Sequence, residues 1–181
     1  MLLRRRPEFG ATARVIHFAP QYEEALARIL KQRSRQYQTA DIAGPECDLH
    51  IDLEALELPD SSVDLFVLNH VLEHVTNDRQ ALAELFRCLT PGGSALITVP
   101  VMEGWPVTQE SDDLSEPMTA HDRLLHFGNS EHVRQYGADI RQRLRQAGFA
   151  LDEFRAVPND VLRYGLERGE VVFVARKDAS P

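Results

Sequence analysis

The stretch from Val63 to Leu68 (VDLFVL) is nearly all apolar, and it limits the fold more than any other part of the sequence. A strand without polar alternation is expected where both faces of a sheet are covered, as in a parallel sheet between layers of helices. Four further short segments read as strands, at residues 14–18, 37–42, 49–53 and 95–99. The sequence therefore predicts a sheet with a buried central strand.

Amphipathic helical segments alternate with these strands. Apolar residues recur at helical spacing over residues 21–33 and again after Asn77, which is placed to cap a helix with Gln80 at its third position. Another helix is expected at residues 139–147, and Ser130 is expected to cap a short one. Two closing strands follow, at residues 149–157 and 170–177. This order predicts the α/β class, with a doubly wound, Rossmann-like, mostly parallel sheet.

The length of the chain indicates its number of domains, and its net charge argues against one class of partner. The 181 residues suit one domain, so we expect residues 1–181 to fold as a unit. The net charge of −8 repels phosphate backbones, so nucleic acid is not an expected partner. No stretch approaches the roughly 18 apolar residues of a membrane span. Cys47 and Cys88 lie far apart and are interpreted as reduced thiols of a cytoplasmic protein.

Acidic residues follow two of the predicted strands. Asp41 comes at the end of the second strand and Asp52 at the end of the third. In doubly wound sheets, ligands bind beyond the carboxyl ends of the strands. An acid after the second strand can accept from both hydroxyls of a ribose, and one after the third can accept from an adenine amine. The pair therefore predicts an adenosyl ligand, and the alternative is that both are loop acids or helix caps.

Several motifs together resemble the class I S-adenosylmethionine-dependent methyltransferases. They are Asp52-Leu53, Leu58–Asp64 (LPDSSVD), Asn69–Val75 (NHVLEHV) and Leu89–Gly93 (LTPGG). The HVLEHV segment is similar to the methyltransferase-11-like group, and His17–Pro20 is similar to a subgroup with "LHxAPE" there. The segment from Phe127 to Gly137 resembles that subgroup's later "FGxxDHVRxYG". The resemblance implies a methyltransferase-type sheet with an antiparallel last strand.

One motif of that family is altered in this chain. Most members carry a glycine-rich turn directly after the first strand, where glycine lets the backbone approach the cofactor. This chain has His17-Phe18-Ala19-Pro20-Gln21 instead, and its next glycine is Gly44. A methyltransferase-like binding or scaffold protein without turnover is therefore the alternative to an enzyme.

The resemblance implies S-adenosylmethionine as the cofactor and assigns its contacts. Asp41 would hold the ribose hydroxyls, Asp52 would accept from the adenine amine, and the backbone of Leu53 would meet the ring edge. The backbone at Asn69 and His70 would face the methionine amine and the sulfonium. The segment after the first strand would line the carboxypropyl side, through His17, Ala19 and Pro20.

The expected acceptor is a small molecule. Methyl transfer is an in-line displacement, and a base near pH 7 helps when the acceptor is a hydroxyl or an ammonium. His70 and His74 are the expected catalytic residues. Residues 101–129 lose periodicity, and a loop or lid insertion is expected over about 101–136. Its expected acceptor-binding residues are Trp105, His126, His132, Arg134 and Tyr136.

Two other readings stay open. His70–His74 (HVLEH) matches the H-x-x-E-H pattern of some zinc hydrolases, in which two histidines four apart on a helix share a metal. No acidic ligand helix is evident downstream, so no metal is expected. A macromolecular acceptor is the other reading, but no basic or repeated segment supplies a docking face for it.

Overall fold

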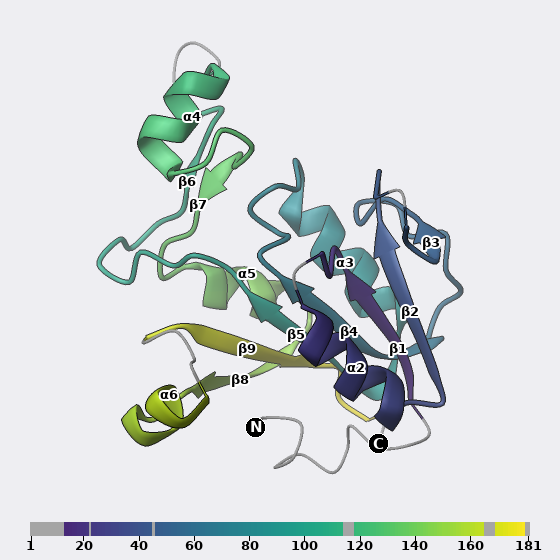
Figure 1. The fold of residues 1–181 in the computed structure, drawn as a ribbon. Coiled ribbons are helices and arrows are strands. Elements are labelled where there is room, and N and C mark those ends of the chain that lie inside the picture. The colour runs from purple at the N-terminus through teal and green to yellow at the C-terminus, as the bar shows by residue number, and fades with distance from the viewer. Residues whose placement is uncertain (1–12, 22, 45, 114–117, 165–168, 180–181) are drawn as a thin grey trace.

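The computed structural model describes residues 13–21, 23–44, 46–113, 118–164 and 169–179. Its main feature is a seven-stranded sheet with the order β3-β2-β1-β4-β5-β9-β8 (Figure 1). The strands are β1 (Arg14–Phe18), β2 (Gln36–Asp41), β3 (Leu49–His50), β4 (Val63–Asn69), β5 (Leu89–Thr98), β8 (Ala150–Arg155) and β9 (Val171–Arg176). Strands β1 to β5 pair in parallel, whereas β9 runs antiparallel to both neighbours. This confirms the predicted doubly wound sheet with an antiparallel last strand.

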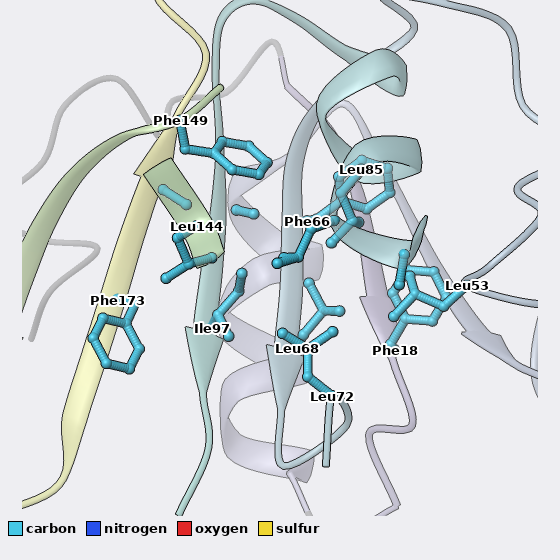
Figure 2. Close-up of a cluster of buried hydrophobic side chains, with 14 of the residues drawn as sticks. Phe18, Leu53, Phe66, Leu68, Leu72, Leu85, Ile97, Leu144, Phe149 and Phe173 are labelled. Carbon is cyan, nitrogen blue, oxygen red and sulfur yellow. The ribbon is translucent and has the colours of Figure 1, made fainter. Parts of the chain in front are cut away.

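Strand β4 lies in the middle of the core, as its apolar sequence predicts. Its four residues from Leu65 to Leu68 are each at most 2% exposed. Helix α2 (Glu24–Arg33) packs on one face through Leu30, together with Leu65. Helices α3 (Asp78–Cys88) and α5 (Ile140–Gln146) pack on the other face. Figure 2 shows that second layer, in which Phe66 and Ile97 of the sheet lie among side chains of both helices. Both faces of β4 are therefore covered.

The start of α3 follows the capping signal in the sequence, whereas the start of the next strand does not follow the predicted bounds. The side chain of Asn77 accepts a hydrogen bond from the backbone N–H of Gln80 at 3.1 Å, so the predicted cap is confirmed. The strand predicted at residues 95–99 starts earlier in the structure, because β5 begins at Leu89 and includes the segment from Thr90 to Gly93. The register of β4 against β5 shifts between Val63 and Leu65 to accommodate it.

The prediction that Ser130 caps a short helix is wrong. The structure instead places helix α4 (Ala120–Phe127) earlier, with Thr119 and Asp122 forming a reciprocal capping box. Gly128 ends α4 in the left-handed conformation, and Ser130 follows in a turn. Helix α6 (Pro158–Tyr164) was also not expected from the sequence.

The insertion predicted after the fifth strand is partly helical. Strand β6 (Gln109–Glu110) pairs antiparallel with β7 (Arg134–Gln135), and α4 projects from this pair, away from the main sheet (Figure 1). Residues 114–117 of the expected insertion lie outside the described residues. None of the helices within the described ranges has the length and hydropathy of a bilayer-spanning segment.

Candidate active site

A cleft of about 770 Å³ opens at the carboxyl ends of β1, β2, β3 and β4. The order of the strands reverses between β1 and β4, which is where ligands bind in sheets of this kind. The cleft is lined by Phe18, Ala19, Gln21, Glu23, Ala40, Asp41, Ile42, Ile51, Asp52, Leu53, Glu54, Asn69, His70, Val71, His74, Val75, Thr76, Asn129 and Glu131. Seven of the residues predicted to bind the cofactor or to catalyse are therefore brought together, namely Ala19, Asp41, Asp52, Leu53, Asn69, His70 and His74.

The two predicted acids are each held by their own loop. Oδ1 of Asp41 accepts from the backbone N–H groups of Ala43 and Gly44, at 2.8 and 2.9 Å. Oδ1 of Asp52 accepts from the N–H of Glu54 at 2.8 Å. The alternative interpretation as loop acids is thus correct for one oxygen of each carboxylate. Within the part of the chain that the structure describes, Oδ2 of each has no hydrogen-bond partner, and both residues line the cleft.

Two residues at the strand ends adopt a backbone conformation that usually favours glycine. Ala19, after β1, has a φ of 45°, and His70, after β4, has a φ of 54°. Both line the cleft. Such a conformation costs a non-glycine residue about 1–2 kcal/mol, and residues of this kind cluster at functional sites. The first strand therefore turns sharply without the glycines of the related motif.

His17, which was predicted to contact the cofactor, does not line the cleft. Its side chain is fully buried, with Nδ1 at 3.0 Å from the hydroxyl of Tyr37 and Nε2 at 3.1 Å from Oε2 of Glu23. The side chain of Asn69 donates to the same oxygen of Glu23 at 2.5 Å. Burial, with the nearby Glu23 carboxylate adding to it, raises the pKa of Tyr37 to about 12. His17 thus contacts the cleft-lining Glu23 from the protein interior. Pro20 is likewise absent from the lining.

His70 is poorly suited to act as a base. One ring nitrogen lies 3.2 Å from Oε1 of Glu73, and the other lies 3.2 Å from Oε1 of Glu170. Hydrogen bonds with Glu170 and then Glu73 raise the pKa of His70 to about 10, despite partial desolvation. The imidazole is therefore a cation near neutral pH, with both nitrogens engaged.

His74 lines the cleft from a run of hydrogen-bonded turns. The N–H of His74 donates to the carbonyl of Val71 at 3.0 Å, and residues 70–75 form no helix. The arrangement of two histidines sharing a metal from one helix is therefore wrong for His70 and His74. The ring of His74 packs edge-on against that of His132, with centroids 4.7 Å apart. Burial lowers the pKa of His132 below its usual value.

Arg134 and Tyr136 use their polar groups in contacts inside the protein. Arg134 is 3% exposed and donates to the carbonyls of Leu72, Val75 and Thr76 and to the carboxylate of Glu110. The hydroxyl of Tyr136 is completely buried and donates to Asp78 at 3.0 Å. Burial raises the pKa of Tyr136 well above its usual value. Both residues were predicted to bind the acceptor, but their polar groups are paired inside the protein and neither residue lines the cleft.

The other expected acceptor-binding residues lie away from the cleft lining. His126 is exposed on α4. The backbone of Trp105 pairs with Met102 and Ala138 in the loop that follows β5. His132 reaches the cleft only through its contact with His74. The sequence of residues 101–136 did not show which of their side chains line the cleft.

Sequence reasoning missed six polar residues of the cleft, which are Gln21, Glu23, Glu54, Thr76, Asn129 and Glu131. An available signal for Glu23 was its acidic side chain a few positions after the first strand. Asn129 and Glu131 carry no such signal, because they reach the cleft through the packing of the segment between α4 and β7.

Comparison with known proteins identifies the matching family and fold. Residues 18–97 match the family model of the methyltransferase domain. A probable S-adenosylmethionine-dependent methyltransferase of Mycolicibacterium smegmatis is 38% identical over 79 residues, which are 44% of this chain and 27% of that protein. A malonyl-[acyl-carrier protein] O-methyltransferase of a Paenibacillus species is 32% identical over 54% of this chain and 33% of its own length. The chain thus spans about a third or less of these two curated relatives.

Solved structures show the same fold over nearly the whole chain. An S-adenosylmethionine-dependent methyltransferase from Mesorhizobium loti has a TM-score of 0.64 at 17% identity, covering 97% of this chain and 95% of that one. A 1,6-didemethyltoxoflavin-N1-methyltransferase of Burkholderia thailandensis, solved with bound 1,6-didemethyltoxoflavin and S-adenosylhomocysteine, has a TM-score of 0.61 at 20% identity. That match covers 96% of this chain and 77% of the other. The chain therefore has the fold of these two structures, and its residues 18–97 match the model of a methyltransferase domain.

Proposed function

We propose that this chain transfers a methyl group from S-adenosylmethionine to a small-molecule acceptor. The observation that carries the proposal is the placement of Asp41 and Asp52 in one cleft at the reversal point of the sheet. The relatives named as S-adenosylmethionine-dependent methyltransferases support it, as does the structural neighbour with bound S-adenosylhomocysteine. Because the chain spans only part of its curated relatives, the acceptor is not taken from any of them.

The adenosyl group would lie across the ends of β1, β2 and β3. Asp41 would accept from the ribose hydroxyls and Asp52 from the adenine amine, each through the oxygen that its loop does not use. The backbone of Leu53 would meet the adenine edge. The left-handed turn at Ala19 would let the backbone approach the methionine portion, as glycine does in the related motif.

The chemistry asks the protein mainly to align donor and acceptor. Methyl transfer from a sulfonium breaks one carbon–sulfur bond as the acceptor attacks from the opposite side, and the thioether leaves. The backbone at Asn69 and His70 would face the methionine amine and the sulfonium. His74, whose side chain lines the same cleft, is the residue that we assign to the acceptor side.

Calorimetric titration tests the cofactor proposal. S-adenosylhomocysteine is titrated into the wild-type protein, into Asp52→Ala and into Glu57→Ala, an exposed acid of the same loop that does not line the cleft. Asp52→Ala should weaken binding by about 1–3 kcal/mol, roughly 5- to 150-fold, as expected for losing a hydrogen bond in a buried site. Glu57→Ala should bind like the wild type. Absence of heat at millimolar ligand with folded wild-type protein would refute the proposal.

A further inference from the structure

Three potential metal ligands meet beside the cleft. Glu73, His74 and His132 each offer one ligand atom, and these atoms lie within 4.8 Å of one another. Glu73 and His74 come from the turns after β4, whereas His132 precedes β7. A backbone hydrogen bond from Val133 to the carbonyl of Glu73, at 2.9 Å, joins the two segments. The cluster is therefore built by the fold and does not depend on free surface side chains.

The carboxylate of Glu73 is buried and incompletely paired. Its residue is 1% exposed, and Oε1 lies 3.2 Å from the ring of His70. Oε2 has no hydrogen-bond partner among the residues that the structure describes. Leaving a buried carboxylate oxygen without a partner is costly, and native structures usually supply one in the form of a donor, a water or an ion. This unpaired oxygen belongs to the same residue that lies against two imidazoles.

The surroundings also orient the histidine ligands. Nδ1 of His132 lies 3.3 Å from the backbone carbonyl of Phe127. If Nδ1 donates there, Nε2 keeps its lone pair, which is how a backbone carbonyl orients a histidine ligand at a metal site. Both His74 and His132 are partly buried, and their rings are in edge-on contact.

We propose that Glu73, His74 and His132 bind one divalent transition-metal cation. Two imidazoles and one carboxylate suit zinc, iron or cobalt, whereas calcium and magnesium prefer oxygen ligands only. Because His74 also lines the cleft, the cation would border the space that the proposed function gives to the acceptor. The link to the acceptor rests on the proposed function, but the cation site itself does not. The site differs from the one suggested by the H-x-x-E-H motif, since His132 takes the place of His70.

Cobalt and zinc binding test the proposal without any cofactor or acceptor. Tag-free protein is stripped with a chelator and titrated with Co²⁺ under a visible absorption spectrum, and separately with Zn²⁺ in a calorimeter. One equivalent should bind per chain, and His132→Ala and Glu73→Gln should each weaken binding at least tenfold. Circular dichroism shows whether each variant is folded.

Two control variants separate this site from adventitious binding. His126→Ala removes an exposed histidine of α4 outside the cluster, and Cys47→Ser removes a thiol that lies 3.4 Å from His50. Both should bind the metal as the wild type does, and metal should raise their melting temperature by the same amount. No stoichiometric binding by the wild type, or equal binding by folded His132→Ala, would overturn the proposal. Neither result would bear on the cofactor titration, so the two proposals fail separately.

Discussion

The side chain of Asn69 donates a 2.5 Å hydrogen bond to Oε2 of Glu23, which joins the end of β4 to the loop after β1. The same oxygen lies 3.1 Å from the buried ring of His17, and Thr98 of β5 donates to the other side of Asn69 at 3.3 Å. These contacts cross the reversal point of the sheet, and both Asn69 and Glu23 line the cleft. They fix the relative positions of the strand ends that we propose contact the cofactor.

Replacing Glu23 should therefore destabilise the protein. Glu23→Ala leaves Nε2 of His17 and the amide of Asn69 without their partner, and a buried unsatisfied group costs about 1–3 kcal/mol. Urea denaturation should show a loss of unfolding free energy in that range. The exposed neighbour Glu24 provides a control, and Glu24→Ala should lose less. Equal losses for the two variants would show that the shared hydrogen bonds contribute nothing.

Glycine at position 19 should stabilise the fold. Ala19 has a φ of 45°, and removing its Cβ relieves the strain of a left-handed alanine. Part of this gain is offset by the greater backbone freedom of glycine in the unfolded chain, so Ala19→Gly should add about 0.5–1 kcal/mol. Ala40→Gly, in the buried part of β2, should destabilise instead. A lower unfolding free energy for Ala19→Gly would show that Ala19 is unstrained.

Much of the fold could be predicted because it depends on local patterns. The apolar sequence of Val63–Leu68 predicts a strand covered on both faces, and the capping pair Asn77 and Gln80 predicts the start of α3. The positions of Asp41 and Asp52 after their strands predict that both line one cleft, since parallel strands end at one edge of a sheet.

The predicted site residues that lie outside the cleft are ones whose contacts depend on distant packing. Arginine is a residue type that often binds anions. The N–H groups of Arg134, however, donate to backbone carbonyls of the segment after β4, about 60 positions earlier. His17 follows the apolar pattern of β1 into the interior, where Tyr37 and Glu23 pair with it. The sequence shows the residue types at these positions but not which neighbours use their polar groups.

Arg134 should contribute to stability, not to acceptor affinity. Arg134→Met removes the donor to the carbonyls of Val75 and Thr76 and to Oε2 of Glu110, and removing one partner of such a buried set costs about 3–5 kcal/mol. Denaturant unfolding should show this loss. Arg28→Met, on the exposed side of α2, should change stability by less than about 0.5 kcal/mol. A small effect at Arg134 would place its guanidinium outside the core.

Stability should fall in acid partly through the carboxylates around Arg141. Hydrogen bonds from Arg141 hold the pKa values of Glu103 and Glu153 below their usual value, with Arg155 adding to the effect. A lowered folded-state pKa gives stability that is present above the ordinary glutamate pKa of about 4.3 and is lost as the pH falls through the lowered values.

Comparing variants isolates this contribution from that of the other acids. The unfolding free energy is measured from pH 5 to pH 2 for the wild type, Arg141→Met and Arg145→Met, the last being exposed on the same helix. Arg141→Met should show a shallower decline than the wild type, whereas Arg145→Met should show the wild-type slope. Parallel curves for all three proteins would contradict the assignment.

A crystal structure of the protein with S-adenosylhomocysteine tests the central claim most directly. The account predicts the adenosyl group in the cleft, with the Asp41 carboxylate within hydrogen-bond distance of the ribose hydroxyls and that of Asp52 within reach of the adenine amine. A cleft left empty in crystals grown at saturating ligand, or a ligand bound without contact to either carboxylate, would contradict it.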